Sequence, residues 1–162
     1  MGIEFNAFEI FEIAEQIERN AVRFYRKAAE LFDKPKIRST LLELAEWETK
    51  HEEIFAEMRK QLSEESSELR SFEPESDMSL YLEAMAGSHV FDTKTDPLEE
   101  LSGIESKENI FKKAIEKEKD SIAYYLGLKE FVSAKAGKDK IDDVIKEEMR
   151  HIGILNQSLE LR

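Results

Sequence analysis

The sequence repeats itself with an offset of 100 residues, and this repeat leaves few possible folds. In both copies apolar residues recur at alternating steps of three and four, the spacing of one face of a packed helix. The identical residues carry most of the repeat. They include Phe11, Ala14, Glu18, Tyr25, Glu48 and His51, which match Phe111, Ala114, Glu118, Tyr125, Glu148 and His151. We therefore expect two copies of one helical hairpin.

The periodicity predicts an all-α fold with four long helices in a single domain, residues 1–162. The first hairpin is expected over residues 7–63, with its first helix at 7–33 and a break near Pro35. Proline is tolerated at the start of a helix but not in its middle. The second hairpin is expected over residues 106–161, with its first helix ending near Gly137. Short turns make each pair antiparallel, which predicts a four-helix bundle.

Residues 64–105 connect the two hairpins, and they are too many for a structureless loop in a compact domain. We expect a long crossover that contains two short helices. The first is predicted around Ser79 to Ala86. The second is predicted to start at Asp96 and Pro97 and to end at Gly103.

Charge and composition exclude several classes of function. The chain has 36 acidic and 24 basic residues, a net charge of −12, so it should repel nucleic acids and anionic membranes. It has no cysteine, which excludes thiolate zinc sites, iron–sulfur clusters and a cysteine nucleophile. It has no long apolar run, so we expect no membrane segment and a cytoplasmic location. Any redox centre must be held by nitrogen and oxygen ligands.

Six ionisable residues occupy positions of the repeat that otherwise hold Phe, Leu, Ala, Ile or Tyr. They are Glu18, Glu48, His51, Glu118, Glu148 and His151. Burying four unpaired carboxylates is strongly unfavourable, because desolvation and mutual repulsion both oppose their charges. Two divalent metal ions would balance them, and this ligand set suits iron or manganese. The alternative is a helical core with satisfied histidines and with the glutamates turned outward.

These residues resemble the ligands of the ferritin-like diiron-carboxylate proteins, and among them those of the rubrerythrins. The resemblance rests on Glu18, Glu48-Thr-Lys-His51, Glu118 and Glu148-Met-Arg-His151, and it spans all four helices. It implies a ferritin-like bundle with two Fe ions, in which Glu48 and Glu148 bridge and the other four residues are terminal ligands. It also implies that Tyr25 and Tyr125 donate hydrogen bonds to ligand carboxylates. Aromatic core packing is an equally good and compatible role for both tyrosines.

The chain departs from the rubrerythrin pattern in two respects. Rubrerythrins carry a further glutamate three residues beyond the third-helix ligand, where this chain has Ser121. The six-ligand set therefore looks closer to the symmetric one of bacterioferritin. Rubrerythrins also carry a rubredoxin domain, whose four cysteines this chain lacks, so its electrons must come from elsewhere.

The resemblance implies an oxidoreductase that reduces hydrogen peroxide or oxygen with electrons from an external donor such as rubredoxin. The main alternative is ferritin-like iron binding, ferroxidation and storage. A third possibility is a metal-stabilised bundle that serves as an interaction module. We expect a homodimer. Trp47 lies beside Glu48 but off the ligand positions, and we expect it to be a packing residue rather than a redox relay.

Overall fold

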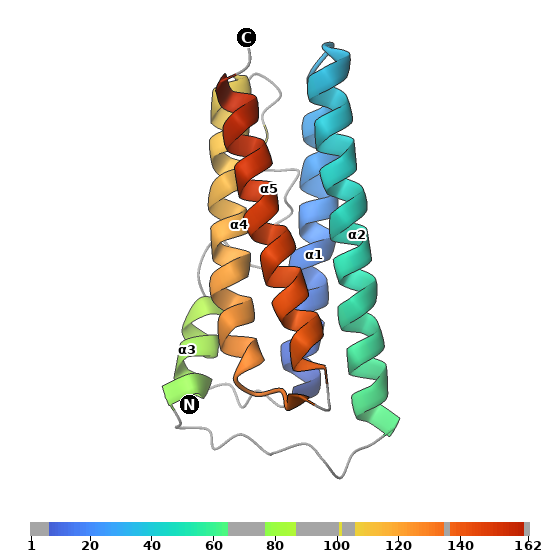
Figure 1. Ribbon diagram of the computed structural model, residues 1–162, viewed down its shortest axis with the longest axis vertical. Helices are drawn as coiled ribbons and strands as arrows, with labels where there is room; N and C mark the ends of the chain where they lie inside the picture. The colour runs from blue at the N-terminus through green and yellow to red at the C-terminus, as the bar shows by residue number, and fades with distance from the viewer. Residues whose placement is uncertain (1–6, 65–76, 87–100, 102–105, 135–136, 161–162) are drawn as a thin grey trace.

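The computed structural model describes residues 7–64, 77–86, 101, 106–134 and 137–160. Within these ranges the chain forms five helices and no strand (Figure 1). They are α1 (Ala7–Glu30), α2 (Pro35–Glu64), α3 (Asp77–Ala86), α4 (Lys107–Lys129) and α5 (Lys138–Glu160). The four long helices form a bundle, which confirms the predicted all-α fold.

The bundle consists of two antiparallel hairpins. Helix α1 packs along α2, and α4 packs along α5, while α1 also contacts α4 and α2 contacts α5. The turns of the two hairpins lie at opposite ends of the bundle (Figure 1). As a result α2 ends and α4 begins at opposite ends as well, so the chain between them must cover the length of the bundle.

Helix α1 ends at Glu30 rather than at residue 33. The backbone N–H groups of Leu31 and Phe32 bond to the carbonyls three residues earlier, a tightening that is common in the last turn of a helix. Pro35 then serves as the first residue of α2, where its missing N–H costs nothing.

The predicted end of the third helix near Gly137 is wrong, because α4 already ends at Lys129. The N–H of Glu130 bonds to the carbonyls of Gly127 and Leu128, and the chain then turns so that Val132 is buried. Gly137 has φ +111, a conformation that favours glycine. It therefore marks the approach to α5 rather than the end of α4.

Helix α3 corresponds to the first predicted crossover helix and starts two residues earlier than expected. It packs against α4 at Gly127, where an added Cβ would lie 2.6 Å from the ring of Tyr81. The Tyr81 hydroxyl also donates a 2.6 Å hydrogen bond to the carbonyl of Ala123. The second crossover helix, predicted to end at Gly103, falls outside the described residues apart from Leu101.

Two apolar clusters fill the bundle, one toward each end. One includes Phe55, Met58 and Ile141, near the α4–α5 turn, and the other includes Leu41 and Phe111. Burying each large side chain of this kind contributes about 1.5–3 kcal/mol. Among the helices described, none is both long and apolar enough to cross a membrane. The charged positions of the repeat lie between the two clusters, so the bundle buries them in its interior.

Candidate metal centre

The bundle brings all six predicted ligand residues together. Helix α1 supplies Glu18, α2 supplies Glu48 and His51, α4 supplies Glu118, and α5 supplies Glu148 and His151. None of the six is more than 2% exposed. The alternative in which the glutamates turn outward is therefore wrong.

Each histidine faces a glutamate of the other hairpin. The Nδ1 atom of His51 lies 2.6 Å from Oε1 of Glu148, and Nδ1 of His151 lies 3.0 Å from Oε1 of Glu48. The two imidazole rings stack, with centroids 5.8 Å apart and an interplanar angle of 20°. The two hairpins thus contribute to the cluster in a reciprocal way.

The six residues form two overlapping groups of four. In each group the potential ligand atoms lie within 4.8 Å of one another. One group is Glu18, Glu48, His51 and Glu148, and the other is Glu48, Glu118, Glu148 and His151. Glu48 and Glu148 belong to both groups, which is the arrangement that two neighbouring metal ions with bridging carboxylates require.

The donor atoms fit such a pair of ions. Among the described residues, Oε2 of Glu18 and Oε2 of Glu118 are buried without a hydrogen-bond partner. An unpaired buried carboxylate oxygen is costly, and a cation bound to it would remove that cost. The mixed carboxylate and imidazole set is one that iron and manganese accept. The residues present therefore fit a diiron site.

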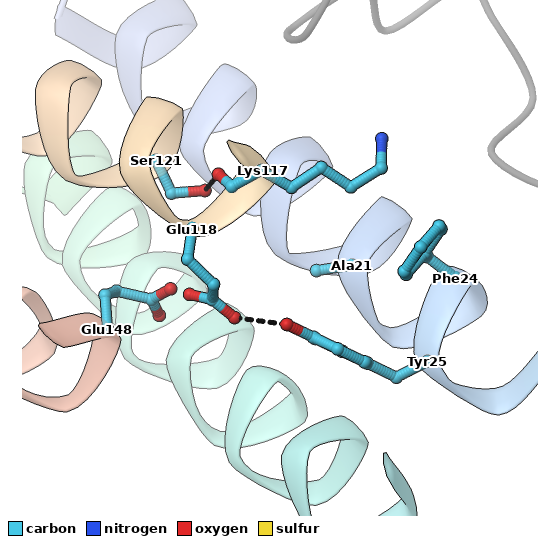
Figure 2. Close-up of a pocket in the computed structure, with 7 residues that line it drawn as sticks. All are labelled: Ala21, Phe24, Tyr25, Lys117, Glu118, Ser121 and Glu148. Atoms are coloured by element: carbon cyan, nitrogen blue, oxygen red, sulfur yellow. Dashed lines mark hydrogen bonds between the residues drawn. The ribbon is translucent and has the colours of Figure 1, made fainter. Parts of the chain in front are cut away.

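Two tyrosines hold the unshared carboxylates across the hairpins. The Tyr25 hydroxyl of α1 donates a 2.6 Å hydrogen bond to Oε1 of Glu118 on α4 (Figure 2). The Tyr125 hydroxyl of α4 donates in the same way to Oε1 of Glu18 on α1. Burial and the neighbouring carboxylates raise the pKa of both tyrosines well above 10, so both phenols stay protonated donors.

Without metal the carboxyl groups differ in protonation. Burial, with repulsion from neighbouring carboxylates, raises the pKa of Glu18 and of Glu148 well above the ordinary value. Burial and the charge of Glu118 raise the pKa of Glu48 to about 7. Burial opposes the charge of Glu118 as well, but interactions with Glu148 and His151 outweigh burial and lower its pKa to about 2.

His51 also carries a proton in the metal-free site. Burial opposes its charge, but the neighbouring carboxylates of Glu18 and Glu48 outweigh burial and raise the pKa of His51 to about 10. In the absence of metal the cluster thus balances its charges with protons. Metal ions would have to displace these protons, because a ligand imidazole and a ligand carboxylate bind in their deprotonated forms.

A small cavity of about 10 Å³ adjoins the carboxylates between α1 and α4 (Figure 2). It is lined by Ala21, Phe24, Tyr25, Lys117, Glu118, Ser121 and Glu148. This volume is roughly that needed for one water molecule. The Ser121 hydroxyl donates a 3.0 Å hydrogen bond to the carbonyl of Lys117. Ser121 therefore forms part of the cavity wall beside Glu118.

Sequence reasoning missed the place of Trp47. Its ring centroid lies 6.4 Å from that of His51 and 6.4 Å from that of His151. One signal was present, because Trp47 and His51 are four residues apart on one helix and so share a face. The contact with His151 depends on how α5 packs against α2, which the spacing within α2 does not reveal.

The comparisons with known proteins agree with this geometry. The family model described as rubrerythrin matches residues 9–158. Among solved structures, the chain is similar to a Thermotoga maritima protein assigned as a ferritin-like diiron-carboxylate protein. The two are 27% identical with a TM-score of 0.67, over 97% of this chain and 96% of that one. No curated protein sequence matches significantly. The ferritin-like fold predicted from the sequence is confirmed.

Proposed function

The chain belongs to the rubrerythrin family, and on that premise we propose that it is a non-haem diiron oxidoreductase. It would reduce hydrogen peroxide, or oxygen, with electrons from an external donor such as rubredoxin. The observation that carries the proposal is the pair of buried ligand groups that share Glu48 and Glu148. A structural metal site would need only one such group.

The residues have distinct parts in this function. Glu48 and Glu148 would bridge two iron ions, and Glu18, Glu118, His51 and His151 would each bind one of them. When bound in the ferrous state, the pair of irons supplies the two electrons that, with two protons, convert hydrogen peroxide into two water molecules. Manganese would fit the same ligands.

The protein itself supplies orientation and a dry environment. Tyr25 and Tyr125 fix the two unshared carboxylates and remain protonated, so these carboxylates keep one orientation as the charge of the site changes. The two apolar clusters exclude bulk water from both ends of the bundle. The cavity beside Glu118 and Ser121 has the size of a very small molecule, which suits peroxide or oxygen better than an organic substrate.

One observation favours a second function, ferritin-like iron binding, ferroxidation and storage. Ser121 stands where the resemblance leads one to expect a seventh carboxylate, and the remaining six ligands are matched in pairs. A symmetric six-ligand centre is the type that the resemblance associates with bacterioferritin. The long crossover supports the oxidoreductase, because a storage cage needs a regular outer surface.

Rapid mixing of the reduced, iron-loaded protein with peroxide, and separately with oxygen, distinguishes the two functions. An oxidoreductase of the proposed kind should hold about two irons per chain and should be oxidised faster by peroxide than by oxygen. Faster oxidation by oxygen, together with uptake of many irons per chain, would reject the proposal in favour of iron storage.

A further inference from the structure

Trp47 contacts both candidate ligand imidazoles and also the charged surface of α2 and α5. Its ring is half-buried, and its centroid is 6.4 Å from each of the two imidazole centroids. The ammonium of Lys50 lies 4.5 Å from the ring centroid, and the guanidinium of Arg150 lies 5.8 Å from it. Both cations are exposed. The ring thus lies between the two buried histidines and the exposed side chains of Lys50 and Arg150.

The internal repeat shows that a hairpin of this type does not require a ring at this place. The position equivalent to Trp47 in the second hairpin is Glu147, whose side chain pairs with Arg150 at 3.5 Å. The candidate metal ligands of the two hairpins are nevertheless the same residue types, one glutamate on the first helix and Glu-x-x-His on the second. The chain uses its one tryptophan where a single ring can touch both imidazoles.

We propose that Trp47 is the relay through which electrons enter the metal centre, from a one-electron donor with anionic groups that docks beside Lys50 and Arg150. The proposal rests on the function proposed above. Two successive transfers would reduce the two ferric ions to ferrous and would oxidise two donor molecules by one electron each. The indole provides the path and is unchanged at the end.

The two cations suit the docking of such a donor. Their positive charge attracts anionic groups, which a chain of net charge −12 otherwise repels. Because Arg150 also pairs with Glu147, Lys50 should account for most of this attraction.

The test measures reduction alone. The iron-loaded protein is first oxidised with ferricyanide and is then mixed without oxygen with excess reduced flavin mononucleotide, an anionic donor that can give up its two electrons one at a time. We expect Trp47→Leu to slow reduction of the irons at least about tenfold, equivalent to ~1.4 kcal/mol of activation free energy, and Trp47→Phe to slow it less. Lys50→Gln should slow reduction by the flavin but not by the methyl viologen radical cation. Lys119→Gln, which removes an exposed lysine on α4, should change neither rate.

A packing role for Trp47 predicts a different outcome. The affinity of the metal-free protein for Co²⁺ reports whether the imidazoles keep their positions, and we expect both tryptophan variants to keep it. Reduction of Trp47→Leu at the wild-type rate would overturn the proposal, as would a loss of Co²⁺ affinity as large as the loss of rate. Ferricyanide replaces peroxide in this test. If peroxide fails to oxidise the wild type, the proposed function fails while the relay can still be measured.

Discussion

The two hairpins carry the same metal-ligand residues in different surroundings. Glu18, Glu48 and His51 of the first hairpin are repeated as Glu118, Glu148 and His151 of the second. Two positions near these ligands differ, because Trp47 corresponds to Glu147 and Ala21 corresponds to Ser121. The first hairpin holds Glu18 with a raised pKa, and the second holds Glu118 with a pKa of about 2.

The residues that repeat are those that would bind the metal ions. The residues that differ are those that would serve the proposed reaction. The repeated residues give two equivalent sets of ligands, which a pair of identical ions requires. The unequal residues lie at the two sides of the centre. Ala21 and Ser121 line the cavity between α1 and α4, while Trp47 covers the imidazoles of α2 and α5. On the two proposals above, the cavity side would receive the small oxidant and the Trp47 side would receive the electron donor.

Removing a shared carboxylate should have the largest effect on iron binding. The effect should be equal for the two hairpins. Glu48→Ala and Glu148→Ala each take a ligand from both groups. We expect iron content to fall from about two per chain to one or fewer, because neither ion keeps its full ligand set. Iron and protein assays of the purified variants measure this.

The neighbours of these residues provide matched controls. Glu46→Ala and Glu147→Ala remove carboxylates that lie one or two positions away, outside both ligand groups. They should leave the iron content unchanged. Equal losses from the controls and the shared glutamates would contradict the assignment of the bridging positions.

Metal removal should destabilise the fold, and more so as pH rises. The raised pKa values mean that folded, metal-free Glu18, Glu48 and Glu148 hold protons that the unfolded chain releases above pH 4. Stability therefore falls as pH rises, by about 1.4 kcal/mol per pH unit for each such group, until the folded pKa is reached. His51 adds to the fall between its unfolded pKa near 6.5 and its folded pKa of about 10.

Thermal melts of loaded and chelated protein between pH 4.5 and 8 check this prediction. At neutral pH we expect chelation to lower the melting temperature by roughly 5–10 °C. The metal-free form should be most stable in mildly acidic solution. Melting temperatures that coincide with and without metal over this range would mean that the carboxylates are not clustered as described.

Ser121→Glu tests the unequal lining of the cavity. The variant adds a seventh carboxylate one turn from Glu118, and residues three apart on a helix address the same site. If the protein reduces peroxide in the rubrerythrin manner, oxidation by peroxide should become faster relative to oxidation by oxygen. Ser121→Gln has nearly the same shape without the charge and should not show this gain. A gain with Gln, or none with Glu, would argue that the six-ligand centre is complete as it stands.

Removing the hydroxyl of either tyrosine should have the smallest effect. The two variants should lose similar amounts of stability. Tyr25→Phe leaves Glu118 without its hydroxyl donor, and Tyr125→Phe does the same to Glu18. Each should lower the unfolding free energy by about 1–3 kcal/mol, the cost of an unsatisfied buried group. Denaturant melts of both variants measure the loss. A loss in only one of them would show that the two hydrogen bonds are not equivalent.

Much of the fold and of the ligand set could be predicted from the sequence, because both copies of the repeat indicate the same buried helix positions. Glutamate at positions that otherwise hold Phe or Leu indicates burial, and burial of four acids indicates metal. The contact of Trp47 with both histidines could not be predicted. The phase of α2 places Trp47 near His51, but only the packing of α5 brings His151 to the same ring. The end of α4 at Lys129 was also missed, because the chain turns there to bury Val132 and contains no proline or glycine at the break.

We expect the two hairpins together to hold one coupled pair of iron ions. Electron paramagnetic resonance of the chain reconstituted with ferrous iron and then oxidised tests it most directly, alongside an iron assay. Two ferric ions that share carboxylates couple magnetically, so the account predicts about two irons per chain and almost no ferric signal. A strong signal from isolated ferric iron, or one iron per chain, would contradict it.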